Sequence, residues 1–153
     1  AAGSAPAWLG RTDAPLEIAL VQQWLAFSPR LTASLGGARL HQMLNMPGDI
    51  DAMSAAGVAA LRELEMGLFE QRERGMRFLA ADRPTIADIA CWPWIRIHRW
   101  AGVELDGLAH VERWLEELNQ RPAFQKGITV PNKVERGKET IEESRRRGSK
   151  ILI

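Results

Sequence analysis

Cysteine, histidine and paired carboxylates perform much of the chemistry in proteins, and this sequence holds few of them. Its single cysteine, Cys91, stands in an apolar stretch, where burial raises the pKa of a thiol and leaves it inert. One cysteine allows neither an internal disulfide nor a thiolate metal cluster. His98 and His110 have no carboxylate or second histidine at ligand spacing, and the acidic residues form no pair spaced for acid–base catalysis. We therefore expect no bound metal.

The most informative spacing is that of Thr85 and Asp88. A threonine followed three residues later by an acid is a variant of the helix capping box. The Thr85 hydroxyl can accept the Asp88 N–H, and the Asp88 carboxylate can accept the Thr85 N–H. The residues that follow are too apolar for a surface helix. We predict a central helix, buried on most sides, that starts at Thr85, kinks at Pro93 and runs to about Ala101.

The residues around this box resemble a known family. The run 78–88, Phe-Leu-Ala-Ala-Asp-Arg-Pro-Thr-Ile-Ala-Asp, is similar to the one that opens the core helix in the C-terminal domain of cytosolic glutathione transferases. The run 86–94 looks most like the bacterial nu-class and related glutathione disulfide reductases. Gln23-Trp24 and the run 121–123, Arg-Pro-Ala, stand in the order that the family shows. The resemblance implies an all-α fold, the helical bundle of the glutathione S-transferase C-terminal domain.

The chemistry that this resemblance implies uses glutathione as co-substrate. Its thiolate attacks a small hydrophobic electrophile or exchanges with a disulfide, and a nearby hydroxyl or amide must lower the thiol's pKa. In the family, that donor and most glutathione contacts lie in an N-terminal thioredoxin-like domain, which this sequence does not contain. No catalytic residue can therefore be named, and we expect the segment to be inactive without that domain.

In the family the helical domain supplies a wall of the second-substrate pocket and much of the dimer interface. The resemblance places that wall on the C-terminal half of the first helix, where the candidates are Phe27, Arg30, Leu31, Ser34, Ala38 and His41. All but Phe27 and Leu31 follow one helical spacing and are expected to face one cleft, whereas those two also fit an ordinary core. The nu class carries a histidine pair near the end of this helix, and only His41 stands here.

Apolar residues at intervals of three and four predict the elements that position these side chains. The first helix spans about 16–44, and Pro29 should kink or split it. A loop over 45–54 leads to a second helix over about 55–79. After the central helix, a fourth helix is predicted over about 108–120.

The chain divides into a linker over 1–15, the helical domain over 16–131 and a charged tail over 132–153 that we expect to be helical in part. The formal net charge is +1, and the tail's arginines are balanced by glutamates, so neither predicts nucleic-acid binding. No apolar run is long enough to cross a bilayer, so we expect no membrane partner. We expect a cytoplasmic homodimer.

Two alternatives stay open. The same helical fold serves as a non-catalytic protein-interaction module in the gamma subunit of translation elongation factor one and in some aminoacyl-tRNA synthetases, and the charged tail fits that interpretation. A stand-alone helical domain that binds an apolar ligand between the first and central helices is the third hypothesis.

Overall fold

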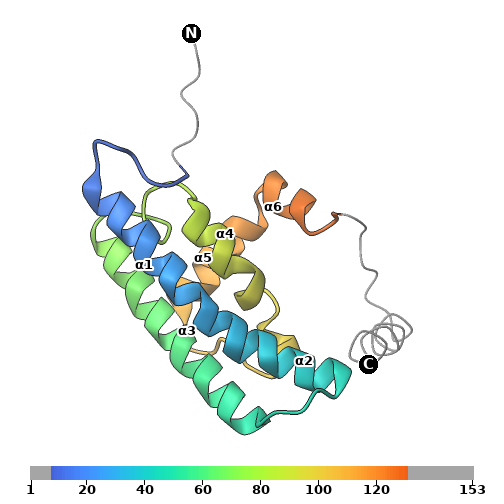
Figure 1. The fold of residues 1–153 in the computed structure, drawn as a ribbon. Coiled ribbons are helices and arrows are strands. Elements are labelled where there is room, and N and C mark those ends of the chain that lie inside the picture. The colour runs from blue at the N-terminus through green and yellow to red at the C-terminus, as the bar shows by residue number, and fades with distance from the viewer. Residues whose placement is uncertain (1–7, 131–153) are drawn as a thin grey trace.

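The computed structural model describes residues 8–130, and all regular structure in that range is helical, as predicted. The helices follow one another as α1 (Pro15–Leu31), the π-helical turn η1 (Thr32–Gly36), α2 (Gly37–Leu44), α3 (Ile50–Glu73), α4 (Ile86–Ile95), the 3-10 turn η2 (His98–Ala101), α5 (Ala109–Asn119) and α6 (Pro122–Gly127). The long rod of α1, η1 and α2 lies beside α3 along one side of the molecule (Figure 1). Helix α4 packs on α1, and α5 packs on α3. The predicted tail helix lies outside the described residues.

The first long helix is split, as Pro29 predicted, but the irregular turn follows the proline. Pro29 has no N–H to donate to the Leu25 carbonyl, and the Ser28 hydroxyl donates to that oxygen instead at 3.2 Å. The π-helical turn η1 begins three residues later. Apolar residues recur at intervals of three and four along this helix, at Leu16, Leu20, Trp24, Phe27 and Leu31. All of them are buried except Leu16, which is 52% exposed.

Helix α3 differs from the prediction at both ends. It begins at Ile50 inside the predicted loop, because the Asp49 carboxylate caps it by accepting the Ala52 N–H at 2.9 Å. It ends at Glu73 because Gly75 adopts a left-handed conformation, with φ of 74°. The Gly75 and Met76 N–H groups then turn back to carbonyls of the last helical turn, at 2.9 and 2.8 Å, which is a Schellman motif.

Helix α4 is shorter and less enclosed than predicted. It ends at Ile95, after which the Ile97 N–H donates to the Trp94 carbonyl and tightens the chain into a 3-10 pattern. The His98 ring then contacts the Val103 carbonyl, with 2.6 Å between Nδ1 and the oxygen. Only one side of α4 is buried, since Ile89 is 45% exposed.

The Asp88 carboxylate joins three parts of the chain. Its Oδ2 accepts the Thr85 N–H at 2.8 Å and the Thr85 hydroxyl at 3.1 Å, within a reciprocal capping box. Its Oδ1 accepts the Leu79 N–H at 3.1 Å and the Trp114 indole N–H at 2.8 Å. Asp88 is fully buried, so burial raises its pKa, while the four donors act in the opposite direction by stabilising the carboxylate.

A second polar anchor holds the linker to the start of α4. The Glu17 carboxylate of α1 accepts hydrogen bonds from the Arg83 guanidinium at 2.7 and 3.3 Å and from the Arg11 N–H at 3.1 Å. The Ile86 N–H, at the first position of α4, donates to the Trp8 carbonyl at 3.0 Å. Backbone and ion-pair contacts thus fix the linker, and the Trp8 side chain remains exposed.

Replacing Asp88 by alanine should lower the free energy of unfolding by about 3 kcal/mol or more, because each buried donor left without a partner costs about 1–3 kcal/mol. Urea unfolding followed by circular dichroism measures this change. Asp106→Ala removes an exposed acid in a loop and should change stability by less than about 0.5 kcal/mol. Equal effects of the two variants would contradict a central role for Asp88.

Glu17→Gln should lower the free energy of unfolding by about 1 kcal/mol at pH 7, since charged partners strengthen a hydrogen bond. The Arg83 hydrogen bond holds the pKa of Glu17 below its ordinary value of 4.5. As pH falls, the Glu17 carboxylate of the unfolded chain therefore binds a proton before that of the folded chain does. The stabilisation that Glu17 gives is complete above pH 4.5 and is lost as pH falls below it. Urea unfolding at several pH values should show the difference from wild type shrinking in acid. A difference that stays constant as pH falls would refute the assignment.

Candidate functional site

A shallow apolar hollow lies between the first long helix and α3. Its volume is about 500 Å³, and its lining is Arg30, Ala33, Ser34, Ala52, Met53, Ala56 and Ala59. The small side chains on both helices leave room there for an apolar group, and the only charge on the lining is that of Arg30. The Arg30 guanidinium lies 5.1 Å from the centre of the Phe27 ring and pairs with Glu63 of α3.

The structure places the six predicted wall residues in three environments. Arg30 and Ser34 line the hollow, although the Ser34 hydroxyl donates back to the Arg30 carbonyl at 2.6 Å. The core encloses Phe27, Leu31 and Ala38. His41 is half-buried on α2, with its Nδ1 2.7 Å from the Met46 carbonyl oxygen. Two of the six therefore share one hollow, and Ala38 and His41 lie outside its lining.

Sequence reasoning named no residue on the α3 side of the hollow, and it placed Ala52 and Met53 in a loop predicted over 45–54. The signal was present in the sequence. Ala52, Ala56 and Ala59 recur at intervals of four and three, which places them on one helical face. Together with the Asp49 cap, this stripe of small residues indicates a helix that another group can approach closely.

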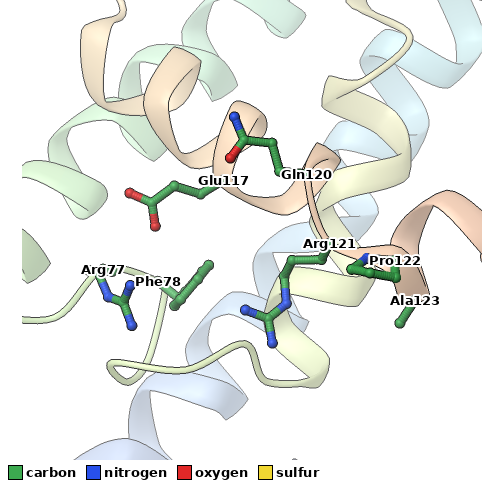
Figure 2. A pocket seen from close by; sticks show the side chains of 7 residues that line it. All are labelled: Arg77, Phe78, Glu117, Gln120, Arg121, Pro122 and Ala123. Carbon is green, nitrogen blue, oxygen red and sulfur yellow. The ribbon is translucent and has the colours of Figure 1, made fainter.

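A second hollow, of about 530 Å³, lies where the loop after α3 meets α5 and α6 (Figure 2). Arg77 and Arg121 lie near the Phe78 ring, with guanidinium carbons 5.7 and 5.9 Å from its centre. Arg77 also pairs with Asp82 at 2.7 Å, and Glu117 on the same lining pairs with Arg72 at 2.6 Å. Since most of these charges have partners, we infer that these side chains hold the loop after α3 against the core.

None of the described residues forms a recognisable catalytic group. Burial raises the pKa of the Cys91 thiol to about 12, so it is protonated and inert at neutral pH. No three metal-binding side chains cluster within residues 8–130. In the same range, no helix combines the length and the apolar character needed to cross a membrane.

Comparison with known proteins agrees with this architecture. The family model of the glutathione S-transferase C-terminal domain matches residues 48–122. Among solved structures, a possible glutathione S-transferase from Rhodopseudomonas palustris superposes with a TM-score of 0.59 at 26% identity, covering 73% of this chain and 51% of that one.

Curated relatives carry related names. A disulfide-bond oxidoreductase of Escherichia coli is 30% identical over 70% of this chain, and a glutathione S-transferase of Aspergillus oryzae is 30% identical over 76%. A glutathione S-transferase of Arabidopsis thaliana is 31% identical over 80% of this chain. The aligned parts make up 39%, 52% and 59% of those proteins, so the chain spans about half the length of its relatives. The chain belongs to the glutathione S-transferase family, and its described helices form that family's C-terminal helical domain.

Proposed function

We propose that this chain is the helical part of a glutathione-dependent enzyme that conjugates glutathione to a small hydrophobic electrophile or uses it to reduce a disulfide. The observation that carries the proposal is the apolar hollow beside Arg30 and Ser34, on the helix where the family resemblance predicted a substrate wall. An apolar substrate would gain about 25 cal/mol for each Å² that it buries there. Arg30, at the edge of the hollow, pairs with Glu63 through one guanidinium nitrogen, and its other N–H groups are donors for the polar end of a bound molecule.

The other four predicted wall residues have supporting roles in this proposal. Phe27 lies under the Arg30 guanidinium and limits where that charge can move. Leu31 and Ala38 are core residues that hold the rod of α1, η1 and α2 in place. His41 is positioned at the far end of the rod by its contact with the Met46 carbonyl.

The proposal places thiolate activation in a separate thioredoxin-like domain. Cys91 is buried, and the chain spans only about half the length of its relatives. It also includes a homodimer that uses the outer face of α3. Val58, Met66 and Phe69 on that helix are exposed, and a group of large apolar side chains on one helix is typical of a contact surface.

Calorimetry with glutathione tests the proposed function on two proteins, residues 1–153 and the full-length product of the gene. We expect binding by the full-length protein alone. If neither protein binds glutathione, the non-catalytic interaction module replaces this proposal. Binding by residues 1–153 alone would contradict the placement of the glutathione site.

Arg30→Ala in the full-length enzyme tests the substrate wall. We expect kcat/KM for a model electrophile such as 1-chloro-2,4-dinitrobenzene to fall about 5–10-fold, which corresponds to about 1–1.4 kcal/mol of transition-state binding. Glutathione affinity should stay unchanged. Arg113→Ala removes an exposed arginine of α5 and serves as the matched control. An Arg30 variant as active as this control would remove Arg30 from the substrate wall.

A further inference from the structure

The hollow between the first long helix and α3 has one large apolar side chain on its described lining, that of Met53. The other apolar residues there are alanines, which have no side-chain rotamers. The Met53 side chain is unbranched and flexible, with a polarisable thioether, so it can repack to fit an irregular space. The room that the hollow offers to an apolar group therefore depends on where the Met53 side chain lies.

Two glycines make the space that the end of the Met53 side chain occupies. A Cβ at Gly48, in the loop that joins α2 to α3, would overlap the Met53 methyl carbon. A Cβ at Gly37, the first residue of α2, would lie 3.2 Å from the Met53 sulfur. The absence of side chains at both positions thus lets the thioether lie close against the backbone.

The backbone around this contact is fixed, so the Met53 side chain is the part that can move. Met53 lies in the first turn of α3, and its N–H donates to the Asp49 carbonyl at 3.0 Å. The Asp49 carboxylate caps the same turn, which holds Gly48, the residue before it, in place relative to the helix. A methyl group added at Gly48 would therefore displace the Met53 methyl. Since Gly37 blocks one side, the open space that remains to it is the hollow.

We propose that Met53 is a specificity-determining residue of this hollow, because the position of its methyl end sets the size of the apolar group that fits. Beside Gly48, the thioether leaves the hollow open; displaced from Gly48, it fills part of the space. The inference rests on the proposed function for the identity of the ligand as an electrophilic substrate. It adds that the enzyme accepts apolar groups of several sizes, since a thioether repacks readily.

Binding of two alkylbenzenes to the full-length protein tests this role without relying on turnover. Toluene and butylbenzene differ only in chain length, and the isotopically labelled methyl group of Ala56, on the lining of the hollow, reports their binding by NMR. Gly48→Ala should lower the ratio of butylbenzene to toluene affinity about 5-fold, because the displaced Met53 methyl takes the place of buried methylenes. Met53→Ala should raise the same ratio about 5-fold, because it frees that space.

The double variant of Gly48→Ala and Met53→Ala isolates the contact between the two residues. Gly48→Ala should not change the ratio once the Met53 thioether is gone. Gly127→Ala is the matched control, because a Cβ there meets no atom within 4 Å, and it should bind both probes as wild type does. The proposal is overturned by an unchanged ratio in Gly48→Ala, by an effect of Gly48→Ala that persists in the double variant, or by an Ala56 signal that neither probe shifts. If Gly48→Ala does not fold, the ratio in Met53→Ala decides.

Glutathione calorimetry on the same protein separates this inference from the proposed function. Glutathione binding together with an unchanged probe ratio in both single variants would remove the role of Met53 and leave the proposed function in place. A changed probe ratio without glutathione binding would remove the proposed function and leave Met53 as the residue that sets the size of the hollow.

Discussion

The buried carboxylate of Asp88 is the interaction on which this domain depends. A lone carboxylate in an apolar core is strongly unfavourable, and this one is stabilised by four hydrogen bonds from three residues. Thr85 starts α4, the Leu79 amide lies within the loop that joins α3 to α4, and the Trp114 indole belongs to the middle of α5. One side chain therefore joins α4, α5 and the loop that precedes α4.

The rod formed by α1, η1 and α2 contributes to two hollows of different character. On the α3 side, alanines and Ser34 leave an apolar hollow with a single arginine. On the α4 side, Gly36 lets Trp94 approach closely, and Arg39 stands over Trp100 in an aromatic hollow. The π-helical turn lies between the two, so a small change in its geometry would alter both.

Sequence patterns predicted the features that depend on residues close together in the chain. These are the all-α fold, the position of the capping box at Thr85 and Asp88, and most of the buried residues of α1. They could not predict that Trp114, distant in sequence, would complete the Asp88 site. The expected single cleft from Arg30 to His41 assumed one continuous α-helix. A π-helical turn holds more residues than an α-turn, so residues beyond η1 are rotated relative to those before it.

The hydrogen bond from the Ile86 N–H to the Trp8 carbonyl holds the linker against the start of α4 and limits the access of proteases to it. A protease must draw an extended strand into its active site, and residues 8–14 cannot supply one while that bond and the Glu17 contacts hold. The bond breaks when the linker leaves the start of α4, beside the Asp88 carboxylate. The rate of cleavage in this segment therefore measures how often the linker detaches from α4.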